Sequence, residues 1–352
     1  MTITVKGTQP YDVVVGTDLA GRLPALVGSA GRVAIIHQAP LRALADRLAA
    51  VLPGHEILRI ELPDGEAAKT LAVAGMCWDR LGTAGFTRSD VIVGLGGGAA
   101  TDLAGWVAAS WLRGVTVIQV PTTLLGMVDA ALGGKTGINT AAGKNLVGAF
   151  HPPAGVLCDL SSLPTLPGAD YRAGLAEIVK AGFIADPVIL ELIEADPTAA
   201  LSPAGPHTQE LITRSIQVKA DVVGEDLTEK GLREILNYGH TLGHAIERAE
   251  GYRWRHGEAV SVGMIFAAEL GLAAGRLDAE VVDRHRRILA ELGLPMSYPA
   301  AAWPALHDAM RVDKKSRGSR LRFIVLDGLA RPGILEDPSD AVLEQAYGRI
   351  AQ

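Results

Sequence analysis

The stretch VIVGLGGGAATDLAGWVA, residues 91–108, decides the fold that we expect for this chain. The apolar run at its start is typical of a buried β-strand, the three glycines Gly96, Gly97 and Gly98 allow a tight turn, and a helical pattern begins near Ala99. Backbone N–H groups in such a turn, together with the positive end of the helix dipole, favour a bound phosphate or pyrophosphate. The stretch therefore predicts an α/β domain with an anion-binding turn.

The glycine spacing leaves an alternative open, because it is not the G-x-G-x-x-G of the standard dinucleotide fingerprint. A tight strand-to-helix turn without any ligand also uses glycines. Asp102, which we expect in the first turn of the helix, is then either a surface acid that favours the helix dipole or a contact to a nucleotide.

Similar apolar runs flank this stretch and alternate with Ala- and Leu-rich helical patterns. They are YDVVVG (11–16), RVAIIH (32–37), HEILRIEL (55–62) and VTVIQVPTT (115–123). This alternation predicts a parallel, Rossmann-like α/β domain over residues 1–160.

Beyond a Pro-rich boundary at 151–167, strand signals nearly vanish. Helices are expected at about 170–195, 206–224, 229–250, 257–275 and 278–293. Residues 161–352 should therefore form a second, mostly α-helical domain.

The composition excludes several classes of protein. Of 352 residues, 48% are hydrophobic and 20% charged, and the net charge of −6 argues against a general nucleic-acid binder. No apolar run reaches the roughly 20 residues of a membrane span, and the amino terminus lacks the pattern of a secretory signal. The only cysteines, Cys77 and Cys158, support neither a disulfide framework nor a cysteine zinc site. We expect a cytoplasmic protein with small-molecule partners.

A Gly-rich stretch, VPTTLLGMVDAALGGKTGINTAAGKNLVG (120–148), carries many polar side chains. They are Thr122, Thr123, Asp129, Lys135, Lys144 and Asn145. The segment GGKTG resembles part of a phosphate-binding P-loop, but Asp129 stands where that motif needs a glycine. The stretch is either a ligand-binding loop or a solvated loop.

Two segments of the second domain place charged or polar side chains together. In DYRAGLAEIVKAGFI (170–184), Glu177 and Lys180 share a helical face, either as an exposed ion pair or facing a cleft. In a helix over 229–250, four polar side chains would form one stripe; they are Arg233, Asn237, His240 and His244.

The two histidines of this stripe could pack, bind a metal or move a proton. Thr241 stands where a zincin H-E-x-x-H helix has glutamate, so that motif is absent. His256 is expected at the start of the next helix, from where a turn could bring it back to the stripe. Two histidines and a carboxylate would leave a catalytic zinc with open positions.

A basic segment, MRVDKKSRGSRLRFIVL (310–326), contains Lys314 and Lys315. Solvated charge and capture of an anionic substrate are both compatible with it.

Together these motifs resemble the 3-dehydroquinate synthase family from about residue 60 to 326. The matching segments are DGEAAKT, GLGGGAATDLAG, QVPTTLLGMVDAALGGKTGIN, GKNLVGAFHPP, LAEIVKAGFI, NYGHTLGHAIE, HGEAVSVGM and DKKSRG. The resemblance implies an amino-terminal NAD-binding domain, a helical carboxy-terminal domain and a divalent metal, Zn²⁺ or Co²⁺, in the cleft between them. It implies Glu177, His240 and His256 as metal ligands, and His244 as a group that contacts the substrate phosphate and handles a proton.

The resemblance also implies substrate and cofactor residues. The substrate set comprises Arg113 reaching in from the preceding strand, Asp129, Lys135, Asn145, Lys180, Lys219, Arg233, Asn237, His244 and Lys314 or Lys315. The NAD set comprises Asp64, Glu66, Lys69, Gly97, Gly98, Asp102, Thr122, Thr123, Asp129, Lys135, Lys144, Ser162 and Thr165. At the adenosine ribose, where many family members have an acidic residue or Asn, this chain has His37 and Gln38.

The activity implied is conversion of an anionic sugar-acid phosphate, 3-deoxy-D-arabino-heptulosonate 7-phosphate, to 3-dehydroquinate and phosphate. NAD would oxidise and then re-reduce the substrate, and a homodimer is expected. A cyclase acting on a substrate without a carboxylate, a metal-dependent polyol dehydrogenase and a non-catalytic module are the alternatives.

Overall fold

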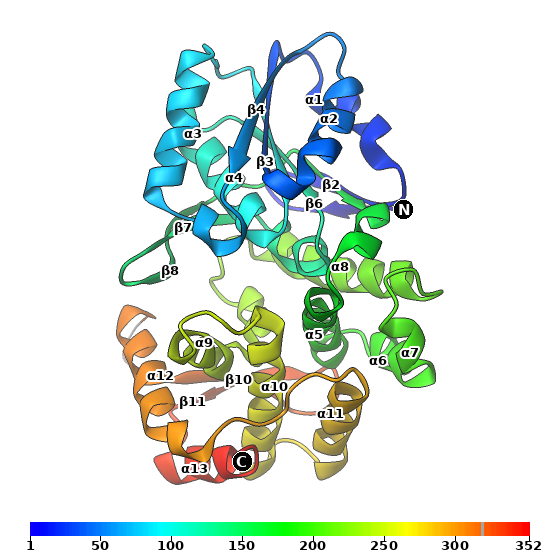
Figure 1. Cartoon of the computed structure of the whole chain (residues 1–352). Helices are drawn as coiled ribbons and strands as arrows, with labels where there is room; N and C mark the ends of the chain where they lie inside the picture. The colour runs from blue at the N-terminus through cyan, green and yellow to red at the C-terminus, as the bar shows by residue number, and fades with distance from the viewer. Residues whose placement is uncertain (318–319) are drawn as a thin grey trace. The chain divides into compact units, whose positions relative to one another are not determined.

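The computed structural model describes residues 1–317 and 320–352, and the side chains of residues 312–319 lie outside the description. The chain divides into two compact units (Figure 1). Unit 1 comprises Met1–Leu166 and Lys219–Thr228, and unit 2 comprises Pro167–Val218 and Glu229–Gln352. The sequence-based boundary after residue 160 stays a prediction.

Unit 1 is an α/β unit, as expected. Its strands are β1 (Thr2–Val5), β2 (Tyr11–Gly16), β3 (Arg32–Gln38), β4 (Glu56–Leu62), β5 (Val91–Gly96), β6 (Thr116–Pro121), β7 (Lys135–Thr140), β8 (Gly143–Phe150) and β9 (Gly155–Asp159). Its helices are α1 (Leu23–Val27), α2 (Arg42–Ala50), α3 (Leu71–Thr83) and α4 (Gly98–Ser110). Short helical turns are η1 (Leu19–Arg22), η2 (Ala39–Leu41), η3 (Gly65–Ala68), η4 (Trp111–Arg113), η5 (Gly126–Ala130) and η6 (Leu160–Thr165).

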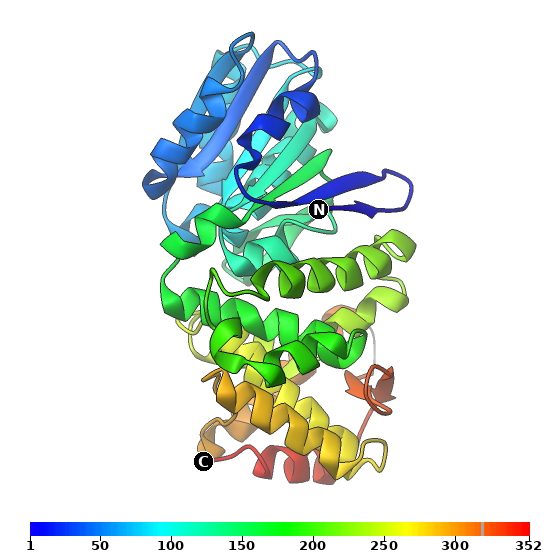
Figure 2. The ribbon, with the colours of Figure 1, turned by 90° about the vertical axis from the view of Figure 1, so that its right-hand side faces the viewer.

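Seven of these strands form one sheet in the order β1-β2-β9-β6-β5-β3-β4. All neighbouring strands are parallel except β1 and β2, which form an antiparallel hairpin at one edge (Figure 2). The stretch 120–148, interpreted as a loop, instead forms η5 and the antiparallel β7–β8 hairpin. The Rossmann-like prediction is confirmed, with these antiparallel additions.

The sheet buries both faces, which explains why its strands are nearly continuous apolar runs. On β3, Val33 and Ile35 pack with α1 and α2, whereas Ala34 and Ile36 pack with α3 and α4. Figure 1 shows these helix pairs on opposite sides of the sheet. This alternation follows from the two-residue period of a strand.

The strand order reverses between β3 and β5. From β3 the chain continues to β4 on one side, while β5, β6 and β9 follow on the other. Ligands of open α/β sheets bind outside the carboxyl ends of strands at such a switch point. Gln38 ends β3 and Gly96 ends β5, so both residues lie at this place.

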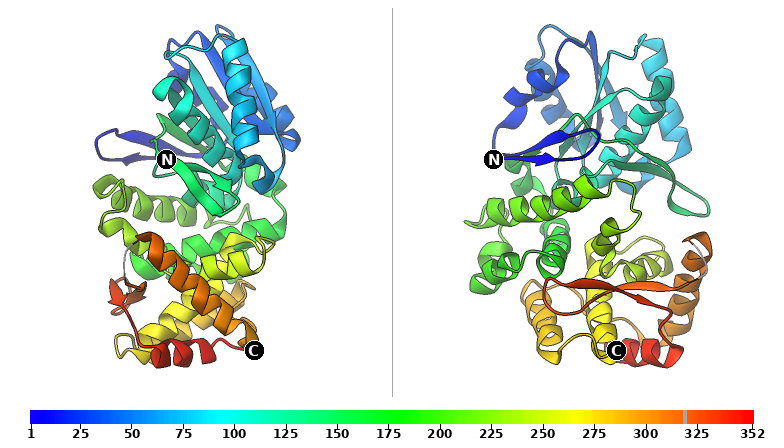
Figure 3. Two further views of the ribbon diagram at one scale, coloured as in Figure 1. Left: turned by 90° about the vertical axis from the view of Figure 1, so that its left-hand side faces the viewer. Right: turned by 180° about the vertical axis from the view of Figure 1, so that it is seen from behind.

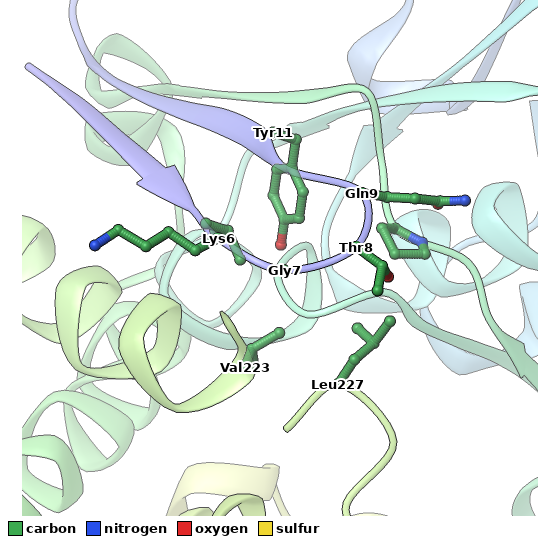
Figure 4. Close-up of a pocket in the computed structure, with 9 residues that line it drawn as sticks. Lys6, Gly7, Thr8, Gln9, Tyr11, Val223 and Leu227 are labelled. Atoms are coloured by element: carbon green, nitrogen blue, oxygen red, sulfur yellow. The ribbon is translucent and has the colours of Figure 1, made fainter. Parts of the chain in front are cut away.

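Residues 219–228 belong to unit 1 because they pack against the β1–β2 turn. A Cβ placed on Gly7 would lie 3.4 Å from the Gly224 carbonyl oxygen. Val223 and Leu227 line a small cavity with residues of the turn and with Tyr11 of β2 (Figure 4). None of the predicted site residues lines this cavity, so it is not the candidate site.

Unit 2 is mostly helical, as expected. Its helices are α5 (Gly168–Ile184), α6 (Val188–Ala195), α7 (Pro197–Ala200), α8 (Thr208–Glu225, ending in unit 1), α9 (His240–Ala249), α10 (His256–Ala273), α11 (Ala279–Glu291), α12 (Trp303–Arg317) and α13 (Asp340–Gly348). Two short turns are η7 (Leu232–Asn237) and η8 (Ala300–Ala302). An antiparallel hairpin of β10 (Arg322–Leu326) and β11 (Pro332–Glu336) completes the unit (Figure 3).

Helix α10 is the central element of unit 2. It is buried along most of its length and packs against α5, α9, α11, α13 and β10. Close contacts with α5 depend on Gly257, where an added Cβ would lie 1.8 Å from the Ala173 carbonyl oxygen. Because α10 is apolar on all its faces, it has to be surrounded by other elements of the unit.

Two predicted helices are wrong in their extent. The helix expected at 170–195 ends at Ile184, and a second helix starts after Pro187. The helix expected at 229–250 is broken: η7 ends at Asn237, and Gly239 has a φ of 80° before α9 begins. The four-residue polar stripe on one continuous helix therefore does not exist.

Candidate active site

Three side chains from three helices of unit 2 form the candidate metal centre. Glu177 comes from α5, His240 begins α9 and His256 begins α10 (Figure 1). The Glu177 Oε1 atom lies 3.6 Å from His240 Nε2 and 3.5 Å from His256 Nε2. One potential ligand atom from each residue lies within 4.8 Å of the others.

These residues fit a divalent metal ion. Ligands about 2.0–2.2 Å from a tetrahedral zinc are separated by roughly 3.4 Å, close to the separations of Glu177 Oε1 from the two imidazoles. Glu177 Oε1 is also buried and has no hydrogen-bond partner among the described residues. Because a buried carboxylate oxygen without a partner is costly, a cation at this place would satisfy it.

The charges around the cluster favour the ionised form of Glu177, which is the form that binds a metal. Burial opposes its ionisation, but the ammonium of Lys180 and the imidazoles of His256 and His240 outweigh burial and hold the Glu177 pKa well below its usual value. Burial and Lys180 lower the pKa of His240, against the attraction of Glu177. Glu177 is therefore a carboxylate, and His240 is a neutral imidazole, at neutral pH.

His256 differs from His240 in its charge. Burial lowers its pKa, but Glu177 and the second carboxylate, Glu247, outweigh burial and raise it to about 10. The His256 Nδ1 atom lies 3.2 Å from Glu247 Oε2. Sequence analysis missed Glu247, although it stands seven residues after His240 and hence two turns along the same helix.

The other predicted residues of unit 2 surround this cluster to different degrees. Lys180 is buried and forms an ion pair with Glu177, which excludes the exposed-pair interpretation. The ring centroids of His244 and His240 lie 5.2 Å apart, and those of His244 and His256 lie 6.0 Å apart. His244 is exposed, whereas His240 is buried.

Arg233 and Asn237 lie on η7 instead of α9. Arg233 is buried, and Asn237 Nδ2 donates a 2.5 Å hydrogen bond to Glu229 Oε1. Glu229 is a second residue that sequence analysis missed. It has a positive φ of 59° just before η7, and no pattern in the sequence indicates this conformation.

The turn between β5 and α4 in unit 1 forms the candidate nucleotide cradle. Gly97 precedes α4 and offers no side-chain cap. Ala100 and Thr101 donate their N–H groups to the Gly97 carbonyl oxygen, which leaves the N–H groups of Gly98 and Ala99 for an anion. A Cβ on Gly97 or Gly98 would lie 3.1 Å from Thr123 or 3.0 Å from Ala130. These glycines therefore allow close approach of the backbone to the segment after β6.

Gln38 lies beside the cradle at the place predicted for the adenosine ribose. A Cβ on Gly96 would lie 2.8 Å from Gln38 Oε1. The preceding side chain, His37, is buried, and its Nδ1 lies 2.9 Å from the Gln38 carbonyl oxygen. Of these two side chains, the Gln38 amide is therefore the one whose position suits a hydroxyl contact.

A buried lysine joins two predicted residue sets within unit 1. Lys69 Nζ donates to Asp102 Oδ2 at 2.5 Å and to Asn145 Oδ1 at 2.5 Å. Burial raises the pKa of Asp102, against the attraction of Lys69. Asp102 lies in the second turn of α4 and not in the first, and it is an ion-pair partner and not a surface acid.

A second ion pair joins Lys219, in the part of α8 that belongs to unit 1, to Asp129 on η5. Lys219 Nζ also donates to the Asp129 carbonyl oxygen at 2.6 Å. Lys135, which begins β7, is exposed.

The remaining predicted cofactor residues lie on the turns of unit 1. Lys144 lies on β8, with its Nζ 3.8 Å from Glu66 Oε1. The Asp64 side chain caps η3. On η6, Ser162 donates its hydroxyl to the Asp159 carbonyl oxygen at the end of β9, and Thr165 donates to the Ser162 carbonyl oxygen.

Arg113 is placed differently from the prediction. It is exposed in η4, with a φ of 71°, and does not lie on a strand. It precedes β6, whereas Thr122 and Thr123 follow the other end of that strand, so the structure does not bring Arg113 to the cradle. The side chains of Lys314 and Lys315 lie outside the described residues.

Two further observations concern the cysteines and the helices. Cys77 and Cys158 are buried free thiols, and burial raises the pKa of Cys77 to about 12. Among the helices described, none is both long and apolar enough to cross a membrane.

Solved structures of sugar-phosphate cyclases share the fold of this chain. The 2-epi-5-epi-valiolone synthase of Streptomyces hygroscopicus, solved with NAD⁺ and Zn²⁺ bound, is 28% identical with a TM-score of 0.88, covering 97% of this chain and 96% of its own. A 2-deoxy-scyllo-inosose synthase, solved with carbaglucose-6-phosphate, NAD⁺ and Co²⁺, is 27% identical with a TM-score of 0.88, covering 99% of each chain.

Sequence comparison gives the family. Residues 59–173 match the model for the 3-dehydroquinate synthase N-terminal domain, and residues 174–316 match that for the C-terminal domain. The 3-dehydroquinate synthase of Thermobifida fusca is 65% identical over 100% of this chain and 97% of its own length, and that of Streptomyces coelicolor is 65% identical over 98% and 96%. The chain belongs to the 3-dehydroquinate synthase family.

Proposed function

We propose that this protein is a 3-dehydroquinate synthase. It converts 3-deoxy-D-arabino-heptulosonate 7-phosphate to 3-dehydroquinate and inorganic phosphate, with NAD and a divalent metal, Zn²⁺ or Co²⁺. The observation that carries the proposal is the cluster of Glu177, His240 and His256, in a chain 65% identical to curated members of this family. The reaction is that of a carbon–oxygen lyase, because the C–O bond to phosphate is broken by elimination; re-reduction, ring opening and an internal aldol closure then give the product.

Glu177, His240 and His256 would hold the metal. When bound, the metal supplies Lewis-acid stabilisation of an alcohol or ketone oxygen and NAD supplies a reversible hydride acceptor, so that no net redox change results. The buried Lys180 keeps Glu177 ionised, and the low pKa of His240 keeps that imidazole neutral. Both side chains are thereby in the protonation state that a metal ligand needs.

The cationic side chains would bind the two anionic ends of the substrate. We assign the phosphate to Lys135, Asn145, Lys180 and His244, and the carboxylate to Lys219, Arg233, Asn237 and Lys314 or Lys315. Arg233 suits a carboxylate because a guanidinium offers a two-pronged fork of N–H donors. Asp129 would orient Lys219, and Arg113 remains assigned to the substrate set by family resemblance.

Proton handling falls to His244 and to the substrate itself. Oxidation of the ring alcohol makes the adjacent C–H acidic, and the substrate phosphate can accept that proton as it leaves. His244 is exposed and has its ring 5.2 Å from that of His240, so it can donate to a phosphate oxygen while His240 keeps its place. Imidazole is suited to this role because its usual pKa is near neutrality.

NAD is assigned to the cradle of unit 1. The pyrophosphate would bind at Gly97 and Gly98, and the remaining contacts are assigned to Asp64, Glu66, Lys69, Asp102, Thr122, Thr123, Asp129, Lys135, Lys144, Ser162 and Thr165. Gln38 would hydrogen-bond the adenosine ribose. The open N–H groups at the start of α4 support this assignment.

We also propose that the protein works as a cytoplasmic homodimer. Family resemblance supports the dimer, and the two free, buried thiols agree with a reducing compartment. Light scattering of the purified protein should give twice the mass of the chain, and a monomer mass would contradict the dimer.

A substrate comparison tests the proposed function. The metal-loaded protein with NAD should release phosphate from the heptulosonate phosphate and form 3-dehydroquinate, detected by mass. Glucose 6-phosphate, which has no carboxylate, should be turned over at least about 10⁴-fold less efficiently, because it cannot contact the side chains assigned to the carboxylate. The reverse preference would assign the protein to a different sugar-phosphate cyclase.

A further inference from the structure

Glu247 is a buried carboxylate beside the metal cluster to which the proposed function gives no role. It lies near the end of α9, and its side chain is only 5% exposed. Its Oε2 atom lies 3.2 Å from His256 Nδ1. Burying a carboxylate costs free energy unless it makes charge-assisted contacts, so the contact with His256 is needed to explain why Glu247 is buried.

The hydrogen bond decides which nitrogen of His256 faces the metal cluster. An ionised carboxylate only accepts hydrogen bonds, so Nδ1 carries the proton that points to Glu247. The lone pair of a neutral His256 ring is then on Nε2, the atom that lies 3.5 Å from Glu177 Oε1. Nε2 is thus the atom presented to a metal.

The second histidine of the cluster is oriented by a different kind of partner. His240 Nδ1 lies 3.1 Å from the carbonyl oxygen of Tyr238, which also only accepts. His240 therefore faces a neutral partner and His256 an anionic one. A carboxylate partner raises the basicity of a ligating imidazole more than a carbonyl does.

We infer that Glu247 is a positioning residue that holds His256 in its metal-binding tautomer and strengthens it as a ligand. This inference rests on the proposed metal site but assigns a residue that the proposed function does not use. The competing interpretation is that Glu247 is itself a ligand, because His244, Glu247 and His256 also offer atoms within 4.8 Å of one another. The two interpretations predict different behaviour of the Glu247→Gln variant.

The experiment measures metal binding to the full chain without substrate. Zn²⁺ and Co²⁺ are titrated against a competing chelator for the wild type, Glu247→Gln and a matched control, Glu269→Gln. Glu269 is also a buried carboxylate of unit 2, but it is bonded to Arg286 at 2.6 Å. We expect Glu247→Gln to bind one metal per chain with a dissociation constant about 10–100-fold higher, as for other partners of metal-bound histidines.

Three further results complete the test. The visible absorption of bound Co²⁺ should shift in Glu247→Gln, and Glu269→Gln should keep both the wild-type spectrum and, within about twofold, the wild-type affinity. Should Glu247→Gln fail to fold, Glu247→Asp, which keeps the charge but shortens its reach, should show the same weaker binding. Melting of the metal-free variants reports any general loss of structure.

Unchanged metal affinity in both Glu247 variants would overturn the inference while leaving the proposed function intact. Loss of stoichiometric metal in Glu247→Gln, with retention in His240→Ala, would make Glu247 a ligand and also overturn it. A wild-type protein that binds no metal would overturn the inference together with the metal assignment of the proposed function.

Discussion

The buried His285 shows how one neutral side chain shapes unit 2. It is fully buried and stacks on Phe183, with ring centroids 3.4 Å apart. Its Nδ1 atom lies 2.7 Å from the Val281 carbonyl oxygen, so Nδ1 carries the proton. Tyr238 therefore donates its hydroxyl to Nε2 at 2.9 Å. This bond anchors the residue whose carbonyl oxygen orients His240.

Because burial lowers the pKa of His285 to about 3, His285 should make stability depend on pH. Its folded pKa lies below its ordinary value of 6.5, so the unfolded chain binds the proton first and stability is lost as the pH falls below 6.5. Between pH 7.5 and 5.5, the free energy of unfolding should fall by about 1.4 kcal/mol more in the wild type than in His285→Gln. Urea unfolding at both pH values measures this difference.

Equal pH dependence of the two proteins would contradict this prediction, because it would show that the folded pKa of His285 is close to its ordinary value. Tyr238→Phe serves as a control, because it removes the hydroxyl partner but keeps the buried histidine. That variant should be less stable by about 1–3 kcal/mol at both pH values, the cost of leaving Nε2 without its donor.

Substitution of His244 and of His240 should affect two different functions, proton handling and metal binding. Removal of the exposed His244 should lower kcat by about 10²–10⁴-fold, the usual contribution of a general acid or base, while one metal per chain is retained. His240→Ala should lose the metal, because two remaining ligands hold zinc poorly. Metal analysis of both variants, alongside steady-state kinetics, measures these effects. Loss of the metal in His244→Ala instead would exchange the two roles.

At the scale of elements, the site depends on how closely α10 approaches α5. Gly257→Ala would place a Cβ 1.8 Å from the Ala173 carbonyl oxygen, so the start of α10 must move away from α5. His256 would move away from Glu177 with it. We expect at least a tenfold loss of metal affinity and a loss of about 2–4 kcal/mol in stability, in the range of severe overpacking.

Gly168→Ala is the matched control for this substitution. Gly168 begins α5, the helix that Gly257 of α10 approaches, but a Cβ there would meet nothing within 4 Å. Its metal affinity and stability should stay near those of the wild type. Equal behaviour of the two variants, measured by metal titration and urea unfolding, would contradict the role of the α5–α10 contact.

The sequence predicted the elements well where local pattern and packing agree. The runs at β3, β5 and β6 are buried on both faces, so their apolar character was sufficient to predict them as strands. The break at Gly239 was missed because the polar and apolar residues around it continue a helical period across it. Its cause is tertiary: a Cβ on Gly239 would lie 2.9 Å from the Met264 backbone nitrogen.

For the whole molecule, the sequence predicted two kinds of unit, and the family resemblance implied the three residues that the structure brings together as the candidate metal centre. The helix predicted over 229–250 was wrong, but this error did not affect the three residues of the cluster. His240 and His256 each begin a helix, and their places at these helix starts bring them together. Glu247 ends the matching segment NYGHTLGHAIE but was given no role, because its 3.2 Å contact with His256 depends on how α9 and α10 pack. Glu229 was missed because it contacts Asn237 from a conformation with positive φ that no sequence pattern indicates. The sequence did not predict that Arg113 lies in the short turn η4 with a positive φ, instead of on a strand.

The central claim is that NAD is recycled while a metal-dependent elimination releases phosphate. The most direct test incubates metal-loaded protein with the heptulosonate phosphate and a trace of NAD, following phosphate and NADH together, with and without a chelator. We predict phosphate in large excess over NAD, no accumulation of NADH, and loss of activity with the chelator. The account would be contradicted if no phosphate were released and NADH formed stoichiometrically from a polyol.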